Sequence, residues 1–332
     1  MQVLITGGAG FLGQRMAQAL LALNALALAG AEAQPIASLV LTDRVAPPPC
    51  ALADPRVRFV GGELNEVLVA HPGLLAQADL VVHLAAAVSG DCEQDLELGL
   101  HSNIDATLAL LRAARDGGRN PVFVYASSVA VFGGMPGLPL PAVIEDDTLP
   151  TPQSSYGIQK FVGEQLVADF TRRGLVRGRN VRLMTVAVRP GKPNGAASGF
   201  LSGMVREPLA GLRTVVPVAP DTPVALASPT HTVAGLLCAC QTSDQRWGAR
   251  TAVNLPALCT TVGDMAQALA RVGGPAAASL LDWQPDARVA AIVGGWPSRF
   301  NAQRAQQLGL QPDASVDALL QDYLMTMQGI SA

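Results

Sequence analysis

Apolar positions in the first half of the chain form short runs that alternate with longer segments of helical periodicity. The short runs predict strands at Val3–Thr6, Leu39–Thr42, Val57–Val60, Leu80–His83, Val122–Ala126 and Val181–Val188. Between them, apolar residues recur every three to four positions, which predicts helices at Phe11–Ala29, Leu96–Arg115 and Ser154–Arg173. Strands that alternate with helices pair in parallel, so the pattern predicts an α/β fold with a doubly wound parallel sheet.

The pattern changes after Pro190, where residues 190–230 are rich in Gly, Pro and Ser and show few clear periods. Further on, helices are predicted at Thr232–Gln241, Thr261–Arg271, Arg304–Leu308 and Val316–Met327. We therefore expect one domain over residues 1–190, to which part of 225–260 returns. A smaller, irregular C-terminal substrate lobe is expected over 191–224 and 261–332.

Composition narrows the class of protein. The 332 residues are 49% hydrophobic and 15% charged, which is enough for a buried core, and the net charge of −3 argues against nucleic acid as the main partner. The apolar run Met16–Ala31 follows a strand and a glycine loop and contains Asn24, so we expect neither a signal peptide nor a membrane helix. Five scattered cysteines without a CxxC pair predict no disulfide framework and no metal site, and favour a cytoplasmic protein.

A glycine loop follows the first predicted strand and opens the first helix. Gly7, Gly10 and Gly13 are three residues apart, and glycine lets the backbone turn tightly and approach a pyrophosphate. The unpaired N–H groups of a helix N-terminus suit phosphate, although a glycine turn without a ligand is the alternative. Asp43 ends the second strand, where a carboxylate can bind the adenosine ribose and repel a 2′-phosphate. This favours NAD over NADP, unless Asp43 is only a turn residue or Arg44 accepts the phosphate.

Two residues of a predicted helix suggest acid–base chemistry. Tyr156 and Lys160 are four residues apart and therefore share a face. A phenol normally titrates near pH ~10, and a nearby ammonium lowers that pKa, so the pair could exchange a proton with an alcohol or carbonyl. Ser128 follows a strand and could hold the reacting oxygen, or only cap a turn. Asn103 either flanks the same site or is an ordinary amide on a helix surface.

Together these residues resemble the extended short-chain dehydrogenase/reductase family. The matching segments run in the family's order over roughly the first 190 residues: Thr6–Gly13, Asp43, His83–Ala86, Asn103, Ser127–Ser128, Val131–Gly133, Tyr156–Lys160 and Arg189–Gly191. The resemblance implies a Rossmann-type fold, with Tyr156 as acid/base and Lys160 holding the nicotinamide ribose. Ser128 aligns with the catalytic serine because it lies five residues before Gly133, and Ser127 is the second choice.

The resemblance also implies which residues contact NAD. These are Gly7, Gly10, Phe11, Leu12, Gly13, Asp43, Glu63, Leu64, Leu84, Ala85, Ala86, Asn103, Tyr156, Lys160 and Pro190. The chain departs from the family pattern at two places. Phe132 stands where tyrosine is frequent, and Gly62-Glu63 stands where Gly-Asp often contacts the adenine.

Shorter segments resemble a subgroup that oxidises the four-carbon sugar acid D-erythronate at C2 to a 2-oxo acid with NAD. They are Val88–Gly90 with Glu93 and Asp95, Arg189–Asn194, Arg206–Leu209 and Ser228-Pro229. The substrate-binding residues implied are Ser89, Ser128, Tyr156, Lys192, Asn194, Ser198 and Arg206. Arginine binds a carboxylate through two parallel hydrogen bonds. The alternatives are a solvated loop charge for Lys192 and an ion pair with Glu207 for Arg206.

Two other functions share these features. A sugar-nucleotide epimerase or dehydratase with tightly bound NAD would use the same Ser, Tyr and Lys, and Lys192, Arg206 and Arg213 could then bind a pyrophosphate. A regulatory protein that senses the nucleotide without catalysis is the third possibility. The resemblance further implies a homodimer through the helices Leu96–Arg115 and Ser154–Arg173. We interpret His231 as a helix-start or packing residue.

Overall fold

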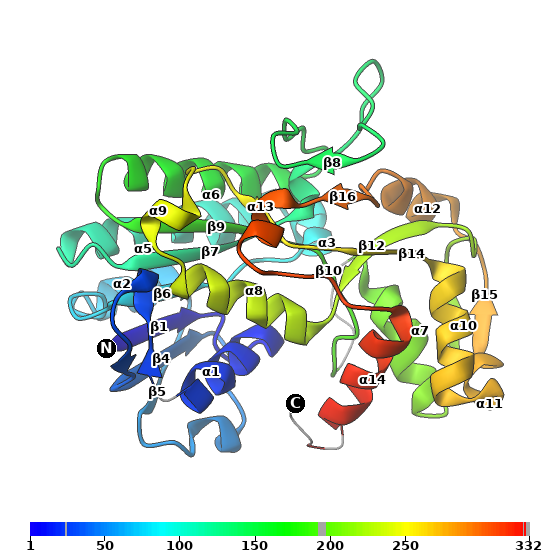
Figure 1. Cartoon of the computed structure of the whole chain (residues 1–332), viewed down its shortest axis with the longest axis horizontal. Coiled ribbons are helices and arrows are strands. Elements are labelled where there is room, and N and C mark those ends of the chain that lie inside the picture. Colours follow the sequence, from blue (N-terminus) through cyan, green and yellow to red (C-terminus); the bar gives the residue numbers. More distant parts are fainter. Residues whose placement is uncertain (24, 192–196, 328, 330–332) are drawn as a thin grey trace. The chain divides into compact units, whose positions relative to one another are not determined.

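The computed structural model describes residues 1–23, 25–191, 197–327 and 329 (Figure 1). The chain divides into two compact units. The first unit comprises residues 1–128, 154–182 and 233–253, and the second comprises residues 129–153, 183–232 and 254–332. Within the described ranges, no helix is both long and apolar enough to cross a membrane.

A seven-stranded sheet with the order β13-β9-β7-β6-β1-β4-β5 is the centre of the first unit. Its strands are β1 (Gln2–Thr6), β4 (Ser38–Asp43), β5 (Val57–Gly61), β6 (Leu80–His83), β7 (Val122–Ser128), β9 (Arg177–Leu183) and β13 (Val253–Asn254). Neighbours from β5 to β7 pair in parallel. The chain winds outward from β1 to β5 and then returns to the other side of β1. This confirms the doubly wound fold and puts the change of winding direction between β1 and β6, where such sheets bind ligands.

Helices cover both faces of this sheet. They are α1 (Phe11–Leu23), α2 (Leu64–Ala70), α3 (Ser89–Gln94), α4 (Leu96–Gly99), α5 (Ala106–Asp116), α6 (Ser155–Arg172), α8 (Pro229–Gln241) and α9 (Asp244–Trp247). Leu4, Val81 and Phe123 lie side by side on β1, β6 and β7. They pack against α2, α5 and α6 in a cluster that includes Leu110 of α5. The intervening positions of each strand face the other side, where α1 buries Met16 and Leu20.

The structure corrects two of the predicted elements. The helix expected over Phe11–Ala29 ends at Leu23, and the chain then forms β2 (Ala25–Leu26), which pairs antiparallel with β3 (Gln34–Pro35). The strand expected over Val181–Val188 begins earlier, at Arg177, and ends at Leu183. Its first residues include arginines whose charges are neutralised by ion pairs, so the apolar pattern alone does not show them as strand.

The predicted helix Leu96–Arg115 is helical along its length, but its middle is not an α-helix. A π-helical segment, Leu100–Asp105, separates α4 from α5. Such a segment is rare and is frequently found at functional sites, because the extra residue in the turn rotates the following side chains.

Among its described residues, the second unit contains three small sheets and a separate helical core. β10 (Thr185–Val186), β12 (Pro223–Ala227) and β14 (Leu258–Thr261) form one sheet, while β11 (Thr214–Val216) pairs with β15 (Leu281–Trp283) and β8 (Ile144–Glu145) with β16 (Phe300–Asn301). Its helices are α7 (Gly199–Leu209), α10 (Val262–Gly273), α11 (Pro275–Ala278), α12 (Ala287–Gly294), α13 (Gln303–Gln307) and α14 (Val316–Met327). Met204, Met265 and Leu320 are buried where α7, α10 and α14 pack together.

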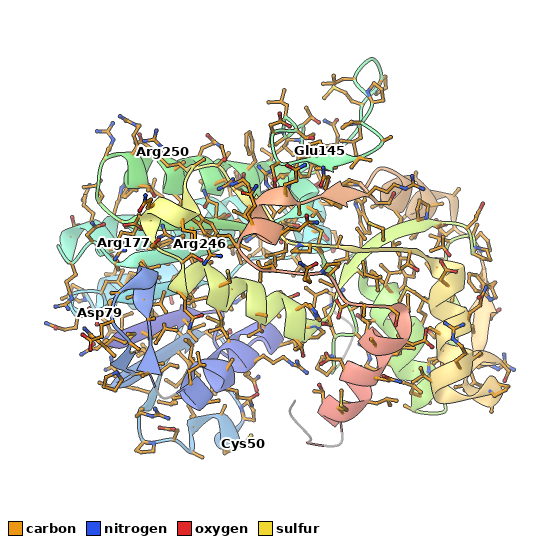
Figure 2. The ribbon with its side chains drawn as sticks, viewed as in Figure 1. Cys50, Asp79, Glu145, Arg177, Arg246 and Arg250 are labelled. Carbon is orange, nitrogen blue, oxygen red and sulfur yellow. The ribbon has the colours of Figure 1, made fainter. Side chains whose placement is uncertain are left out.

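This division differs from the one predicted from the sequence, which assigned residues 129–153 to the first domain. They belong to the second unit because β8 pairs with β16, some 150 residues later. Next to Glu145, labelled in Figure 2, the Asp146 carboxylate accepts a hydrogen bond from the backbone N–H of Arg304 at 2.8 Å.

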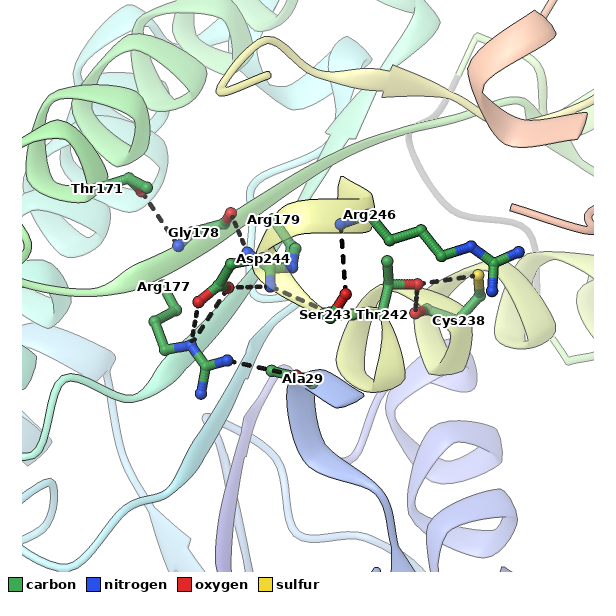
Figure 3. Close-up of polar contacts among 10 residues, drawn as sticks. All are labelled: Ala29, Thr171, Arg177, Gly178, Arg179, Cys238, Thr242, Ser243, Asp244 and Arg246. Atoms are coloured by element: carbon green, nitrogen blue, oxygen red, sulfur yellow. Dashed lines mark hydrogen bonds and ion pairs between the residues drawn. The ribbon is translucent and has the colours of Figure 1, made fainter. Parts of the chain in front are cut away.

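The returning segment 233–253 is tied to the first unit by an arginine pair on β9 (Figure 3). The Arg179 guanidinium is 3% exposed, bonds the Asp244 carboxylate and lies 5.3 Å from the centre of the Trp247 ring. Arg177, labelled in Figure 2, donates to the same carboxylate at 2.9 Å. Burial lowers the pKa of Arg179, and the Asp244 charge opposes that shift.

Replacing Asp244 with alanine is therefore expected to lower the free energy of unfolding by about 1–2 kcal/mol. Loss of one partner leaves the buried Arg179 charge without its anion, but Asp244 is 57% exposed, so solvent screening reduces the effect. Urea denaturation would measure it. Asp169→Ala is the matched control, because Asp169 pairs with Arg172 and Arg173 at the surface. Equal losses in the two variants would contradict the role of Asp244.

Candidate active site

The glycine loop leaves no room for a side chain at Gly7, Gly8 or Gly13. Gly7 has a φ of +68°, and a Cβ there would lie 2.8 Å from the Ala85 nitrogen, while a Cβ on Gly13 would overlap the carbonyl oxygen of Gly7. Gly8, which the sequence analysis did not single out, would place a Cβ 2.8 Å from that of Leu41. The loop thus presses against the ends of β4 and β6 and begins α1 with bare backbone, the cradle that a dinucleotide pyrophosphate requires.

Two acidic residues lie at the ends of neighbouring strands: Asp43 is the last residue of β4, and Glu63 comes shortly after β5. The Asp43 carboxylate accepts hydrogen bonds from the backbone N–H groups of Ala9 at 3.1 Å and Val45 at 3.4 Å, so it orders the glycine loop and a turn. Glu63 is the N-cap of α2 and accepts from the N–H of Asn65 at 2.9 Å. Both carboxylates thus already accept hydrogen bonds from backbone N–H groups, and both remain partly exposed.

A buried hydrogen-bond chain, not foreseen from the sequence, connects the glycine loop to α5. The two ring nitrogens of His83 lie 2.6 Å from the Thr6 hydroxyl and 2.9 Å from that of Thr107. Thr107 donates its proton to the Asn103 carbonyl, so His83 Nε2 is the donor to Thr107 and Nδ1 accepts from Thr6. The Thr6 hydroxyl in turn accepts from the N–H of Ala85 at 3.2 Å. Burial, together with the Lys160 charge, lowers the pKa of His83 to about 3, so the ring is neutral.

Asn103 lies in the π-helical segment and is 1% exposed, so the interpretation as a surface amide was wrong. Its Oδ1 accepts from the Ala87 N–H at 2.8 Å, and its Nδ2 donates to the Ala87 carbonyl at 3.2 Å and to Gln159 Oε1 at 2.7 Å. Gln159, also missed by the sequence analysis, directly precedes Lys160. Asn103 therefore fixes the loop after β6 to the helix that carries Tyr156 and Lys160.

Tyr156 and Lys160 lie on α6 as predicted, with Ser154 as the N-cap. The Lys160 ammonium lies 5.7 Å from the centre of the Tyr156 ring and donates to the Ala126 carbonyl at 2.8 Å. Burial lowers the pKa of Lys160 to about 8, against the opposing effects of Cys92 and Glu164. A cation is thus held beside the Tyr156 ring, the arrangement that favours a phenolate.

The two serines at the end of β7 differ in their surroundings. Ser127 is 2% exposed and donates its hydroxyl proton to the Glu164 carboxylate at 2.5 Å. Ser128, the last residue of the strand, is partly exposed. The Ser127 hydroxyl proton is therefore already used in a hydrogen bond within the first unit.

The predicted substrate-binding residues are spread over both units. Ser89 is the first residue of α3. In the second unit, Ser198 accepts from Arg189 Nη2 at 3.2 Å, and the Arg206 side chain, 13% exposed, donates to the Arg189 carbonyl at 2.9 Å. Arg206 also forms the ion pair with Glu207 that was weighed as an alternative. Lys192 and Asn194 lie outside the described residues.

His231 has the predicted place in the first turn of α8. Its backbone N–H donates to the Ser228 hydroxyl at 3.1 Å, and its Nδ1 lies 2.9 Å from an oxygen of Asp313. The same nitrogen lies 3.0 Å from Ser228, so serine and aspartate share one ring nitrogen. A hydrolytic triad uses both ring nitrogens, so this arrangement is not such a triad, and its contacts join His231 to Ser228 and Asp313 at the start of α8.

Comparisons with known proteins agree with this geometry. The model of the "NAD dependent epimerase/dehydratase family" matches residues 3–222. The chain is 49% identical to the D-erythronate dehydrogenase of Cupriavidus necator over 98% of each chain. It is 39% identical to the D-erythronate dehydrogenase of Haemophilus influenzae over 98% of this chain and 99% of that one.

A solved structure extends the similarity to three dimensions. The nucleoside-diphosphate-sugar epimerase from Agrobacterium tumefaciens has a TM-score of 0.87 and 35% identity, and the match covers 100% of this chain and 95% of that one. The glycine cradle and the Tyr156–Lys160 pair are the parts of this chain that fit a nicotinamide dinucleotide. The chain thus belongs to the NAD dependent epimerase/dehydratase family, the extended short-chain dehydrogenases/reductases, with NAD as its cofactor.

Proposed function

We propose that this protein oxidises a small sugar acid of the D-erythronate type at its C2 hydroxyl, giving a 2-oxo acid. The observation that carries the proposal is the 49% identity to a D-erythronate dehydrogenase over nearly the whole of both chains. The Lys160 ammonium beside the Tyr156 ring supports the chemistry, because alcohol oxidation needs a base at the hydroxyl.

The roles of the residues follow from their positions. NAD, when bound, supplies the acceptor for the hydride that leaves C2. The phenolate form of Tyr156, which the Lys160 cation stabilises, takes the proton of the C2 hydroxyl as the C=O bond forms and so becomes the neutral phenol. Ser128 holds the reacting oxygen; Ser127 does not suit this role, because its hydroxyl is bonded to Glu164.

Cofactor binding is assigned to the edge of the sheet at the switch point. The backbone at Gly7, Gly10 and Gly13 would hold the pyrophosphate, and Asp43 the adenosine ribose. Asn103 acts indirectly, by fixing Ala87 and Gln159, since both atoms of its amide are bonded inside the unit. The remaining proposed contacts are Phe11, Leu12, Glu63, Leu64, Leu84, Ala85, Ala86 and Pro190. For the sugar acid they are Ser89, Lys192, Asn194, Ser198 and Arg206.

The direct test is absorbance at the NADH wavelength, with purified protein, NAD or NADP, and a panel of four- to six-carbon sugar acids. Reduction of NAD with a tetronate supports the proposal. Silence across the panel, with NAD still tightly bound, refutes it.

A sugar-nucleotide epimerase is the second candidate, favoured by the name of the Agrobacterium structure that shares 35% identity with this chain. An epimerase returns the hydride to its substrate, so it produces no net NADH. Incubation with nucleoside-diphosphate sugars, followed by separation of the epimers, distinguishes the two reactions. A purely regulatory role would leave both assays silent.

Replacing Asp43 with asparagine is expected to weaken NAD binding about tenfold and to reduce the preference over NADP. The amide can still accept the N–H of Ala9, so the loop keeps its order, but it no longer repels a 2′-phosphate and bonds the ribose less strongly. Titration calorimetry with both nucleotides measures the change. Asp54→Asn, which alters an ion pair with Arg56, serves as control. Unchanged selectivity would assign Asp43 to the turn alone.

Homodimerisation and a cytoplasmic location complete the proposal. The apolar side chains of Leu96 on α4 and Ile158 on α6 are 55% and 49% exposed, which supports these helices as the contact. Light scattering of the purified protein would decide this, since a monomer mass contradicts the dimer.

A further inference from the structure

The end of β7 is fastened to α6 by two side chains of that helix. Lys160 donates to the Ala126 carbonyl at 2.8 Å, and Glu164, one helical turn later, accepts from the Ser127 hydroxyl at 2.5 Å. The two bonds hold consecutive strand residues directly before Ser128. Tyr156 lies one turn before Lys160 on the same helix. The two bonds therefore fix the position of Ser128 relative to Tyr156.

Glu164 is itself held rigidly. Arg182 of β9 donates to both of its carboxylate oxygens, each at 2.8 Å, and the two side chains are 5% and 2% exposed. Asn180 adds a bond to the Glu164 carbonyl at 3.0 Å. A buried ion pair contributes little net stability compared with apolar residues of similar volume, so its value lies elsewhere, in fixing one geometry.

We propose that Glu164, held by Arg182, is a positioning residue that uses the Ser127 hydroxyl to set the place of Ser128 relative to Tyr156. This inference rests on the proposed function, because the distance matters only if Ser128 and Tyr156 act on one substrate oxygen. A misplacement of about 1 Å at such a site can reduce turnover ~100-fold, so an anchor next to Ser128 has kinetic consequences.

Glu164 has a second effect, on charge. Its carboxylate raises the pKa of Lys160 and so opposes the larger effect of burial, and the net result is a pKa lowered to about 8. His83 and Tyr125 also face the ammonium, but His83 is neutral and burial raises the Tyr125 pKa well above its ordinary value. Cys92 opposes the burial effect as Glu164 does. Glu164 thus helps to keep Lys160 cationic at working pH.

Ser127→Ala is the principal test, because it removes the anchor and leaves the ion pair of Glu164 and Arg182 in place. We expect kcat to fall about tenfold, with the KM for the sugar acid and the Kd for NAD changed less than about twofold. Ser127→Thr, which keeps a hydroxyl, should restore turnover. Thr171→Val is the matched control. Thr171 joins α6 to β9 through the Gly178 N–H at 3.1 Å, far along the helix from Tyr156 (Figure 3).

Glu164→Gln tests the effect on charge. An amide of the same shape should move the alkaline limb of the kcat–pH profile to lower pH by about half a unit or more, because Lys160 loses its proton more readily. A merely structural role would lower kcat at every pH without moving that limb. If this variant fails to fold, Ser127→Ala still decides the positioning.

Hydrogen–deuterium exchange separates this inference from the proposed function. Ser127→Ala should speed exchange in residues 122–131, and Thr171→Val should not. If the wild-type protein makes no NADH from any sugar acid, the proposed function fails. The exchange rates then still test whether the Ser127–Glu164 bond holds the end of β7. Unchanged exchange in Ser127→Ala, or full turnover in that variant, overturns the positioning role.

Discussion

Tyr156→Phe is expected to reduce NADH production from a sugar acid by a factor of about 10²–10⁴. The phenylalanine ring fills the same space and keeps its place beside the Lys160 ammonium, 5.7 Å from the ring centre. What is lost is the hydroxyl that takes the substrate proton. Steady-state kinetics with NAD and a tetronate measure the effect as a fall in kcat.

The same variant should bind NAD nearly as well as the wild-type protein, because the glycine loop and Asp43 are untouched. Tyr323→Phe is the matched control. It removes the same atom from a buried tyrosine on α14 of the second unit and should keep turnover. If Tyr156→Phe retained a tenth or more of the activity, Tyr156 would not be the base.

Lowering the pH from 7 to 4.5 is expected to cost the folded state about 2–3 kcal/mol through His83 alone. The pKa of this buried ring is lowered to about 3, whereas an unfolded histidine titrates near ~6.5. Between these two pH values the unfolded chain binds a proton at His83, whereas the folded chain keeps the ring neutral. Stability from His83 is therefore complete above pH ~6.5 and declines as the pH falls through that window, by about 5 kcal/mol at its end.

His83→Gln isolates this contribution. A glutamine amide can donate and accept as the neutral ring does between Thr6 and Thr107, but it does not titrate. Urea unfolding at the two pH values should show that the variant loses about 2–3 kcal/mol less stability on acidification than the wild-type protein. All other acid-sensitive groups are common to both proteins. Parallel pH dependences would mean that His83 is not buried as a neutral ring.

The sequence predicted those parts of the fold whose apolar patterns are strong and local. Leu80–His83 was predicted with the bounds that the structure has. Helix α7 was missed, because Gly199, Gly203 and Pro208 weaken its periodicity and the helix depends on packing against β11 and α10. The sequence could not show that residues 129–153 belong to the second unit. That assignment depends on the pairing of β8 with β16, two residues each, far apart in the chain.

The candidate site shows the same limit. The glycine loop and the Tyr156–Lys160 spacing are local motifs and could be predicted. Thr6 and His83 belong to segments that match the family, but the hydrogen bond between them was missed, as was that of Glu164. In both cases the partners are distant: Thr6 and His83 are 77 residues apart, and Ser127 and Glu164 are 37 apart. Asn103 was found, but its burial depends on a π-helical turn that no periodicity indicated.

The first unit is assembled from three separate stretches of chain, and this affects how it is made. A ribosome that has finished residue 190 has produced every strand of the sheet except β13, which extends it beyond β9. Until residue 244 emerges, Arg179 has no Asp244 to bind, and until residue 254 emerges, β9 is an open edge of the sheet. A fragment cut at residue 190 is therefore a poor choice for a minimal nucleotide-binding domain, and one that joins 182 to 233 by a short linker is the better design.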